Sequence, residues 1–580
     1  MAFLGVKNSL TGRCWVGPDI LAGRIAEAIN QKSDLPPSLC NVMARLGVSP
    51  DKAIQYLEPQ LKTLLPDPRK LIDMTIASAR LLKALDRSEK IAIFADYDVD
   101  GAASAALLLA WLKFFGATAT LYVPDRLTEG YGPNNTAMST LANKHDLIIC
   151  VDCGTVSHGP ISSVAGTDII VLDHHLGSEK IPDCVAVVNP NRQDESSELG
   201  YLCAAGVAFL CLVECGRLLR KEGLKGPDLM GYLDLVALAT IADVAPLIGV
   251  NRAFVRQGLK VMANRSRPGL VALADQAKMN SAPTASHLAF MLGPRINAGG
   301  RVGQADLGVR LLATHDMREA QKLSEHLDGL NNERRQIEEL VQAQAFSQAQ
   351  ERGFDVPLVW AAGEGWHPGV IGIVAARLKE ATNRPAIVIS LDGSEGKGSG
   401  RSVSGIDLGA AIQILAKQDI LLKGGGHKMA AGLTVSRSML EPAMGKLSEL
   451  LKKQGANKLG ASDLYLDSVL MPTAATIDLI TQLESAGPFG AGAPHPRFAF
   501  PDMAISFAKR VGENHLKIRF GDGINQSIDG IVFCAYDTAI GPALERHDGR
   551  RFNLAGRLEI NEWQGKRSVQ LRLEDAAPIV

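Results

Sequence analysis

The sequence predicts a multidomain α/β protein that ends in an all-β segment. Between about residues 90 and 190, short β-rich apolar runs alternate with segments able to form helices or turns, which is typical of a mostly parallel sheet. A second α/β pattern runs from about residue 357 to 453, and from about residue 460 alternating apolar and charged residues indicate a β-barrel. At 580 residues the chain is longer than one ordinary hydrophobic core, so we expect several domains.

The N-terminal part, residues 1–85, is expected to form a mainly helical cap. Its segment PDPRKLIDMTIASARLLKAL has apolar residues at helical spacing after a proline-rich start. The parallel-sheet domain is expected to cover residues 86–315. Its strands are predicted in the runs KIAIFA, TATLYV, DLIICV, DIIVL and VAVVN, and helices are predicted over residues 202–242.

A long polar segment follows the first α/β domain. Residues 316–353 are rich in charge and in helix formers, which predicts a helix that connects two domains; a surface helix of one domain fits the periodicity equally well. Residues 354–455 are expected to form a smaller α/β domain. Its two glycine-rich stretches, GSEGKGSGRS and LLKGGGHKMAAG, allow a ligand to approach the backbone closely.

The last predicted domain covers residues 456–580. In HLKIRF, Leu516, Ile518 and Phe520 alternate with Lys517 and Arg519. The pair RLEINEW and RSVQLRLE flanks a Gln-Gly turn, as in a β-hairpin. We therefore expect strands in this segment that have one buried face.

The composition limits the function classes only weakly. The formal net charge is -1 and the apolar content is 46%, so a nucleic acid would have to be bound by local basic clusters. The nine cysteines lack the spacing of a zinc site or a disulfide framework, which is typical of a reducing cytoplasm. The N-terminal segment MAFLGVKNSLTGRCW has no adequate apolar h-region, so secretion is not expected. The long apolar stretches elsewhere are interrupted by Lys113 or Asp243, so membrane insertion is not expected either.

Three aspartates follow the first predicted strand of the sheet, in the segment DYDVDG. Asp96, Asp98 and Asp100 lie between the run EKIAIFA and a helix-like segment. Ligand sites in open α/β sheets lie beyond the carboxyl ends of the strands, and carboxylates suit Mg²⁺ or Mn²⁺. The position and residue type together predict a metal site.

Other interpretations of this loop are weaker. A calcium loop of the EF-hand type would need a bidentate Glu where this chain has Leu107. A phosphatase with an aspartyl nucleophile would have Gly and Thr after its Asp-x-Asp, whereas Ala102 and Ala103 follow the glycine here. Helix capping needs only one aspartate, and three on a short loop would repel one another without a cation or several donors.

Further metal-competent groups follow other predicted strands and helices. Asp152 follows DLIICV, the triplet Asp173, His174 and His175 follows DIIVL, and Asp243 follows DLVALATIA. Each alone could be a helix cap or a hydrogen-bonded turn, but a parallel sheet would bring these ends to one rim. We therefore expect a binuclear centre. Two cations can lower the pKa of a bridging water, orient a phosphate and neutralise the leaving oxygen, and imidazole ligands favour Mn²⁺ over Mg²⁺.

At this point the chain resembles the DHH phosphoesterase superfamily, and more closely the bacterial RecJ-type single-strand-specific exonucleases. The resemblance spans about residues 57–500. It rests on an ordered set of motifs: DYDVDG, DRLTEGYG, VDCGT, LDHH, LCAAGVAF, TIADVAPL, GPRINAGGR, GWHPGVIGIVAARL, GSGRS and GGGHKMAAG. It implies a DHH domain, a connecting helix, a DHHA1 domain and, in the barrel-like tail, an OB-fold.

The resemblance also implies the metal ligands and catalytic residues. Two Mn²⁺ or Mg²⁺ ions would be held by Asp96, Asp98, Asp152, His174 and Asp243, with Asp100 and His175 in or near the ligand set. Asp96, Asp98, Asp152, His174 and His175 would be the catalytic group. Many members have a His just before the first aspartates, where this chain has Phe94, so one metal is expected to have fewer protein ligands.

Substrate contacts are implied for residues of several motifs. A lone Arg is more often part of a surface ion pair, but the resemblance favours contacts with DNA or its terminal 5′ phosphate. The expected residues are Arg126, Tyr131, Arg295, Asn297, Arg301, Ser399, Arg401 and His427. In the barrel, single-stranded DNA could be bound through Lys517, Arg519, Arg557, Lys566 and Arg567, with Phe520 or Trp563 as stacking residues; the same basic residues could be a solvated strand face.

The function that the resemblance implies is 5′→3′ exonucleolysis of single-stranded DNA in DNA repair and recombination. A narrow channel would exclude duplexes, and the partners would be single-stranded DNA, a single-strand-binding protein and a helicase, with no membrane. Two other functions stay open: a DHH phosphodiesterase for small nucleotides or short oligonucleotides, and a non-catalytic replication scaffold. The first gives no purpose to the C-terminal barrel, and the retained acidic motifs argue against the second.

Overall fold

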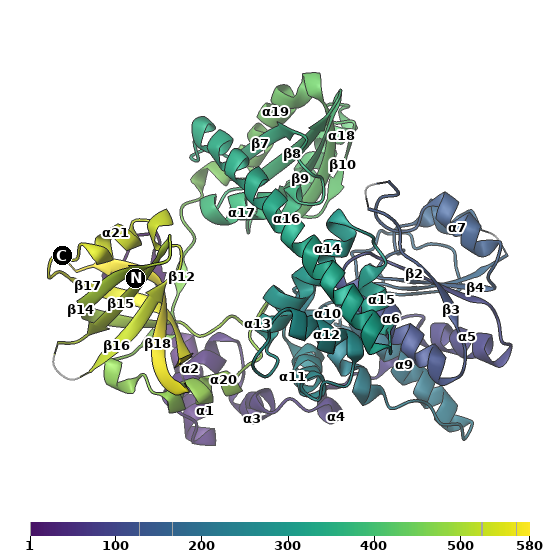
Figure 1. The fold of residues 1–580 in the computed structure, drawn as a ribbon, viewed down its shortest axis with the longest axis horizontal. Coiled ribbons are helices and arrows are strands. Elements are labelled where there is room, and N and C mark those ends of the chain that lie inside the picture. The colour runs from purple at the N-terminus through teal and green to yellow at the C-terminus, as the bar shows by residue number, and fades with distance from the viewer. Residues whose placement is uncertain (1, 127, 165, 524–525, 564, 580) are drawn as a thin grey trace. The chain divides into compact units, whose positions relative to one another are not determined.

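The chain folds into two compact units in the computed structural model (Figure 1). The structure describes residues 2–126, 128–164, 166–523, 526–563 and 565–579. The sheet unit, as we call it, consists of Pro59–Glu339 and Pro488–Ala493. The barrel unit consists of Met1–Glu58, Leu340–Gly487 and Pro494–Val580.

The sheet unit is built on a five-stranded sheet in which every neighbouring pair is parallel, as the sequence predicts. The strand order is β3-β2-β4-β5-β6. The strands are β2 (Ile91–Ala95), β3 (Ala119–Tyr122), β4 (Leu147–Val151), β5 (Asp168–Leu172) and β6 (Ala186–Val188). Because all five strands run the same way, their carboxyl ends form one edge of the sheet.

Helices cover both faces of this sheet, which explains why β2 and β4 are apolar throughout and fully buried. On one face, Phe94, Cys150 and Val171 pack with Met138 and Ile161. These last two residues come from α7 (Asn135–Ala142) and α8 (His158–Ser162). The helices α5 (Met74–Asp86), α6 (Val99–Phe114) and α9 (Ala204–Lys221) also pack against strands of the sheet.

The remaining helices of the sheet unit follow in the second half of its sequence. The short α4 (Leu61–Leu64) packs against α11 (Gly249–Ala263), and α10 (Leu233–Ala242) packs against α6 and α11. A π-helical turn, Leu288–Leu292, leads directly into α14 (Gly293–Val302). The other elements are α12 (Pro268–Gln276), α13 (Ala285–His287) and α15 (Leu307–Ala313).

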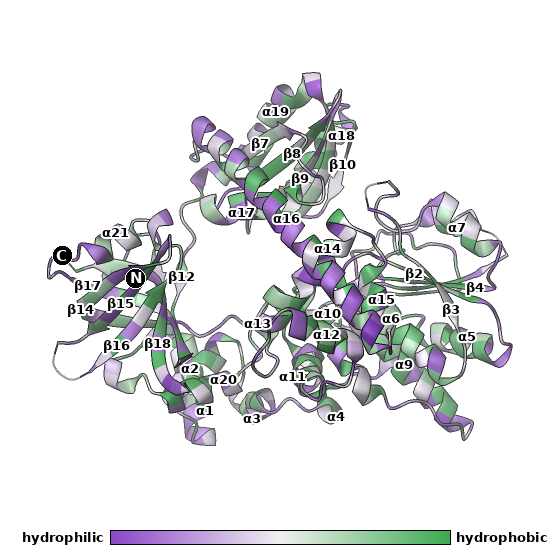
Figure 2. Cartoon of the chain, in the orientation of Figure 1, coloured by the Kyte–Doolittle hydropathy of each residue, from purple (hydrophilic) through white to green (hydrophobic). Residues whose placement is uncertain are grey.

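The predicted connecting segment forms one long helix, α16 (Met317–Arg352), which is largely hydrophilic in Figure 2. Its first part belongs to the sheet unit and its last part, from Leu340, to the barrel unit.

A mixed five-stranded sheet of the order β10-β11-β9-β8-β7 follows α16. β7 and β8 are parallel, whereas the pairs β8–β9, β9–β11 and β10–β11 are antiparallel. The strands are β7 (Val359–Glu364), β8 (Ala386–Asp392), β9 (Glu395–Arg401), β10 (Lys423–Gly426) and β11 (Ala430–Ser436), with helices α17 (Ile371–Thr382), α18 (Leu408–Lys417) and α19 (Leu440–Lys453). Both glycine-rich stretches predicted from the sequence lie in strands of this sheet and in the turns beside them.

The C-terminal segment is a closed β-barrel. Its order is β13-β14-β15-β16-β18-β17, and the additional pairing of β14 with β17 closes it. The strands are β13 (Ser468–Val469), β14 (Phe498–Val511), β15 (His515–Gly521), β16 (Ser527–Val532), β17 (Arg551–Trp563) and β18 (Lys566–Pro578), with helices α20 (Ile477–Ser485) and α21 (Ile540–Glu545).

The predicted alternation of apolar and basic residues in β15 is confirmed. It also shows that the stacking role predicted for Phe520 is wrong. Leu516, Ile518 and Phe520 are fully buried in the barrel. Phe520 therefore cannot stack on a base, because the same alternation that makes β15 a strand directs this ring into the core. The side chain of Trp563 and the predicted turn residue Gln564 lie outside the described residues.

The N-terminal segment joins the barrel rather than the parallel sheet. β1 (Trp15–Val16) pairs in parallel with β12 (Leu464–Tyr465), and the buried Trp15 donates its indole N–H to Asp575 Oδ2 at 2.8 Å. Helices α1 (Ile20–Ser33), α2 (Pro37–Arg45) and α3 (Ala53–Leu57) follow. Arg45 forms an ion pair with the buried Asp467, which attaches the end of α2 to the barrel segment.

Within the described residues, none of the helices combines the length and the apolar character that crossing a bilayer would require. All nine cysteines lie in the described part of the chain as free thiols.

Candidate metal centre

The aspartate-rich loop joins the end of β2 to the start of α6. Asp98 is the N-cap of α6 and accepts hydrogen bonds from the amides of Asp100 (2.8 Å) and Gly101 (3.1 Å). One of the three aspartates is thus a helix cap, whereas Asp96 and Asp100 are buried with exposed fractions of 4% and 1%. Burial of two further carboxylates in one turn is costly unless a cation or several donors compensate.

Gly101 lets this turn close tightly. A Cβ atom at this position would lie 2.4 Å from the carbonyl oxygen of Asp96 and 2.9 Å from its amide nitrogen. Only glycine allows the start of α6 to approach the Asp96 backbone this closely.

Asp100 is oriented by the start of α9. Both of its carboxylate oxygens accept backbone hydrogen bonds, from Ala204 at 2.6 Å and from Ala205 at 2.8 Å. The N-terminus of a helix supplies free amides and a favourable dipole for such an anion.

Asp152 follows β4 in a left-handed backbone conformation, with φ of 60°. It is 1% exposed, and its carbonyl oxygen accepts a hydrogen bond from the Tyr131 hydroxyl at 3.0 Å. Asp adopts this conformation more readily than most residues, so the backbone can turn sharply at the end of β4.

The predicted Asp-His-His triplet forms the turn after β5, and its Asp is an anchor. Asp173 accepts hydrogen bonds from the amides of His174 (2.7 Å) and His175 (3.2 Å), and from the amide and hydroxyl of Thr155. It also accepts a hydrogen bond from His175 Nδ1 at 2.8 Å. Because the carboxylate can only accept, Nδ1 carries the hydrogen and Nε2 is the atom that can face a cation.

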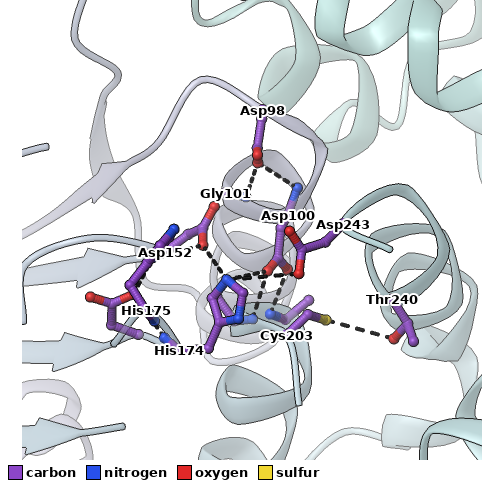
Figure 3. Close-up of polar contacts among 12 residues, drawn as sticks. Asp98, Asp100, Gly101, Asp152, His174, His175, Cys203, Thr240 and Asp243 are labelled. Carbon is purple, nitrogen blue, oxygen red and sulfur yellow. Dashed lines mark hydrogen bonds and ion pairs between the residues drawn. The ribbon is translucent and has the colours of Figure 1, made fainter. Parts of the chain in front are cut away.

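His174 brings the separate segments together (Figure 3). Its Nε2 atom lies 3.3 Å from Asp152 Oδ1, 3.7 Å from Asp100 Oδ2 and 3.8 Å from Asp243 Oδ2. Asp243 reaches this point from the C-terminal end of α10. Residues from four separate ends of strands and helices thus meet at one edge of the sheet, as expected from the parallel order.

The donor set fits divalent cations. Three groups have one ligand atom from each member within 4.8 Å of one another: Asp96, Asp98 and Asp152; Asp100, His174 and Asp243; and Asp152, His174 and His175. The buried Oδ1 atoms of Asp96 and Asp152 have no hydrogen-bond partner in the described part of the chain. Mixed carboxylate and imidazole ligands suit Mn²⁺ and, where oxygen dominates, Mg²⁺.

The electrostatics of these side chains also favour a bound cation. Burial and the neighbouring carboxylates raise the pKa of Asp96 and of Asp152 well above its usual value. Burial and the charges of Asp100 and Asp98 raise the pKa of Asp243 to about 8. Burial lowers the pKa of His175. The hydrogen bond to Asp173 and the negative charge of Asp173 have a larger effect and raise the pKa of His175 to about 9. A cation at this site would replace protons that the crowded carboxylates otherwise retain.

The Asp243 pKa gives a pH prediction for the metal-free chain. A carboxyl whose folded-state pKa is raised to about 8 stabilises the fold at low pH, and this contribution is lost as the pH rises from about 4 to 8. In EDTA, we expect the melting temperature of the wild-type chain to fall as the pH rises over this range. The melting temperature of Asp243→Asn should fall less. Thermal melts at pH 5, 6.5 and 8 test this; an equal slope for both proteins would contradict it.

Phe94 lies two residues before Asp96 and has no ligand role. Its ring is fully buried and stacks on Tyr122, with ring centroids 5.3 Å apart. The neighbouring metal position therefore lacks an imidazole from β2.

The substrate residues predicted in the sheet unit lie in different surroundings. The Arg126 guanidinium lies 5.2 Å from the ring centroid of Tyr97. Burial and the nearby Arg126 and Arg334 lower the pKa of Arg301 to about 10, which indicates a positive cluster beside the metal loop. Asn297 accepts a hydrogen bond from the Val99 amide at 3.0 Å, so it holds that loop.

Arg295 and Tyr131 make contacts within the protein. Arg295 pairs with Asp328 at 2.8 Å and donates to the Met291 carbonyl at 2.7 Å. The Tyr131 hydroxyl lies 3.0 Å from His175 Nδ1 and 3.3 Å from its Nε2, beside the metal centre.

The other predicted substrate residues lie in the barrel unit. Arg401 Nη1 donates to Ser399 Oγ at 3.2 Å. Both side chains lie near the start of α17, since a Cβ added to Gly372 would be 3.0 Å from Ser399 Oγ and 3.1 Å from Arg401 Nη2. His427 is exposed in the turn between β10 and β11.

The basic residues of the barrel are largely paired with acids. Lys517 and Arg519 both contact Asp529, at 3.4 and 2.7 Å, and Arg557 pairs with Glu574. Different side chains are presented to solvent: the ring centroid of the half-exposed Phe533 lies 4.9 Å from the Arg572 guanidinium.

Sequence reasoning missed three residues that hold the triplet turn, namely Thr155, Asn189 and Asn191. Asn189 and Asn191 follow β6 in the segment VAVVNPN. The sequence signal for Asn189 and Asn191 is their position directly after another strand of the same parallel sheet. The carboxyl end of that strand lies at the edge where we expect the metal-competent groups.

Comparisons with known proteins agree with this architecture. Family models match residues 90–240 (DHH family, N-terminal domain), 355–454 (DHHA1 domain) and 466–575 (RecJ OB domain). The chain is 37% identical to the single-stranded-DNA-specific exonuclease RecJ of Dickeya dadantii, over 94% of this chain and 98% of that protein. It is 34% identical to the protein of the same name in Escherichia coli, over 96% and 98% of the two chains.

A solved structure shows the same fold with metal bound. The crystal structure of RecJ from Thermus thermophilus in complex with Mn²⁺ superposes with a TM-score of 0.81 at 29% identity, over 97% of this chain and 79% of that one. A Mg²⁺ complex from the same organism gives a TM-score of 0.74 at 28% identity, over 97% and 78%.

Proposed function

This chain belongs to the RecJ family of single-stranded-DNA-specific exonucleases, and we propose that it removes nucleotides from the 5′ end of single-stranded DNA. The observation that carries this proposal is the convergence of five aspartates and two histidines at the carboxyl edge of the parallel sheet. The enzyme is a metal-dependent phosphodiester hydrolase, and its cofactors are Mn²⁺ or Mg²⁺.

We assign the metal ligands as Asp96, Asp98, Asp152, His174 and Asp243. Two bound cations would activate water, orient the scissile phosphate and neutralise charge on the leaving oxygen. Asp100 orients this set through its hydrogen bonds to the start of α9, and Asp173 orients His175. Asp98 has a second task, since its N-cap hydrogen bonds fix the loop that also carries Asp96.

We assign substrate binding first to two charged groups beside this centre. Arg126 and Arg301 lie beside Tyr97 and would contact the DNA backbone, since two guanidiniums in one place favour a phosphate. Arg295 and Asn297 would support the contacts of Arg126 and Arg301 from α14 of the same unit, and Tyr131 would shape the entrance beside His175. In the barrel unit, we propose Ser399, Arg401 and His427 as further substrate residues.

The domain assignment is a separate part of the proposal and keeps the bounds predicted from the sequence. We propose an N-terminal cap (residues 1–85), a catalytic DHH domain (86–315), a connecting helix (316–353), a DHHA1 substrate domain (354–455) and an OB-fold that binds DNA (456–580). The free thiols fit a cytoplasmic location. A single-strand-binding protein and a helicase are proposed partners, since they would supply accessible single strands.

The experiment that tests the function is digestion of an end-labelled single strand. A 5′-phosphorylated strand with Mn²⁺ should release labelled mononucleotides from the 5′ end first, and a matched duplex should stay intact. Release from the 3′ end would contradict the polarity. A strong preference for dinucleotides over long strands would instead favour the small-nucleotide phosphodiesterase.

The barrel should bind DNA by stacking at Phe533. The ring is 48% exposed, its centroid lies 4.9 Å from the Arg572 guanidinium and 5.2 Å from the His515 ring centroid, and single-strand-binding proteins stack bases on aromatic rings and use nearby Arg side chains. We expect Phe533→Ala to weaken binding of a long single strand by about 1–3 kcal/mol, the usual range for one stacked base. Fluorescence anisotropy measures this.

The control for this substitution is Phe354→Ala, since Phe354 is also an exposed ring, at 39%, but follows α16 outside the barrel. An equal effect of both substitutions would show that Phe533 has no specific stacking role.

A further inference from the structure

We propose that Asn189 and Asn191 are positioning residues, which orient the two imidazoles of the metal centre by binding the peptide carbonyls of His174 and His175. This inference rests on the proposed function, because it assigns both residues to the same metal centre. Neither side chain needs to touch a cation or the substrate to act in this way.

Asn189 binds the turn at its second histidine. Its side chain is fully buried, and its Nδ2 atom donates to the His175 carbonyl and to Thr155 Oγ1, both at 2.7 Å. Its Oδ1 atom accepts a hydrogen bond from the Asn191 amide at 2.7 Å. Both N–H donors and one of the two acceptor positions of this amide are therefore directed at the turn and its supports.

Asn191 binds the preceding peptide. Its Nδ2 atom donates to the His174 carbonyl at 2.6 Å and to the Gly200 carbonyl at 3.2 Å. Two consecutive carbonyls of the turn are thus fixed by two side chains that both follow β6. One proline separates the two asparagines along the chain.

Asp173 and Thr155 complete the arrangement from the amide side of the same turn. Asp173 Oδ1 receives the amides of His174 and His175, and Asp173 Oδ2 receives the Thr155 hydroxyl at 2.6 Å. Thr155 in turn accepts from Asn189, so one continuous chain of hydrogen bonds runs from Asn189 to the amides of both histidines. The turn is held at its amides by an acceptor and at its carbonyls by donors.

This arrangement determines where the imidazoles point. Rotation of either peptide would move a histidine Cβ and carry the ring away from the other ligands, of which Asp152 lies 3.3 Å from His174 Nε2. Metal ligands must be placed within a few tenths of an ångström, and their outer hydrogen-bond partners typically contribute about 10- to 100-fold to metal affinity. An ionised Asp could not replace Asn at either position, because it has no N–H to donate to a carbonyl.

The experiment is a Mn²⁺ titration of the full chain without DNA, by calorimetry or by electron paramagnetic resonance of free Mn²⁺. We expect Asn189→Ala and Asn191→Ala each to weaken Mn²⁺ binding by about 10- to 100-fold. In nuclease assays the Mn²⁺ concentration for half-maximal activity should rise by a similar factor. At saturating Mn²⁺ the KM for DNA should stay within about twofold of the wild-type value, because neither asparagine contacts the substrate.

Two controls separate positioning from general loss of structure. Asn30→Ala removes a comparable amide donor, whose Nδ2 binds the Leu35 carbonyl at 2.6 Å in the barrel unit, and should leave Mn²⁺ affinity unchanged. Asn191 is less buried than Asn189, so Asn191→Ala provides the test if Asn189→Ala does not fold.

Unchanged Mn²⁺ affinity in a folded Asn191→Ala protein would overturn the inference, as would an equal loss in Asn30→Ala. The titration is independent of the proposed reaction. If the wild-type chain binds Mn²⁺ but does not digest single strands, the proposed function fails while the positioning role is still measured.

Discussion

Asp152→Asn should lower the rate of single-strand digestion by at least about 10³-fold while leaving the chain folded. Asp152 belongs to two of the three ligand groups, and its buried Oδ1 atom has no hydrogen-bond partner in the described residues. Asn is the appropriate replacement because it tolerates the left-handed backbone, with φ of 60°, better than other side chains do. The initial rate with Mn²⁺ measures the loss.

The same substitution should not destabilise the metal-free protein. Burial and the surrounding carboxylates raise the pKa of Asp152, so removal of its charge relieves repulsion in the apo state. We expect the melting temperature in EDTA to stay the same or rise, whereas the stabilisation by Mn²⁺ should largely disappear.

Asp146→Asn is the matched control, because Asp146 precedes the same strand β4 at its opposite end and accepts a hydrogen bond from the Lys90 amide at 2.8 Å. This variant should keep near wild-type activity. Unchanged nuclease activity in purified Asp152→Asn would show that the acidic cluster does not catalyse the measured digestion.

Gly101→Ala should have the second-largest effect. The added Cβ would lie 2.4 Å from the Asp96 carbonyl oxygen and 2.8 Å from its carbonyl carbon, and backbone atoms cannot move aside as the end of a flexible side chain can. We expect activity to fall by at least about 100-fold and stability by roughly 1–3 kcal/mol, the usual cost of overpacking. Urea unfolding and the digestion rate measure the two effects.

Gly159→Ala serves as its control. Gly159 lies in α8 of the same unit, and a Cβ there would meet no atom within 4 Å. This substitution should be neutral or slightly stabilising, because alanine favours a helix. Wild-type activity in Gly101→Ala would mean that the metal loop can shift without loss of function.

The parallel sheet and the location of the metal centre could be predicted because both depend on local patterns. Five apolar runs of strand length, several of them followed by a polar group, define one edge once the sheet is parallel. Asp96, Asp152, His174 and Asp243 could therefore be assigned to one centre although the first and the last are far apart in the sequence. The comparisons with RecJ proteins then support the reaction class.

The details that could not be predicted depend on pairings between distant residues. Arg295 pairs with Asp328, and Lys517 and Arg519 share Asp529, so basic residues that resembled DNA contacts in the sequence are partly neutralised. The prediction of Phe520 as a stacking residue was wrong, although the pattern of β15 already groups Phe520 with Leu516 and Ile518 on the apolar face, which is the buried one. Phe533 follows β16 without such a pattern.

The pairing of Trp15 with Asp575 has a consequence for biosynthesis. Trp15 emerges from the ribosome early, whereas its hydrogen-bond partner is 560 residues further along the chain. At typical rates of about 5–20 residues per second, the interval is roughly half a minute to two minutes. Throughout that time the tryptophan and its apolar neighbours lack the last strands that bury them. A nascent chain halted before those strands would therefore expose a hydrophobic segment to chaperones and proteases.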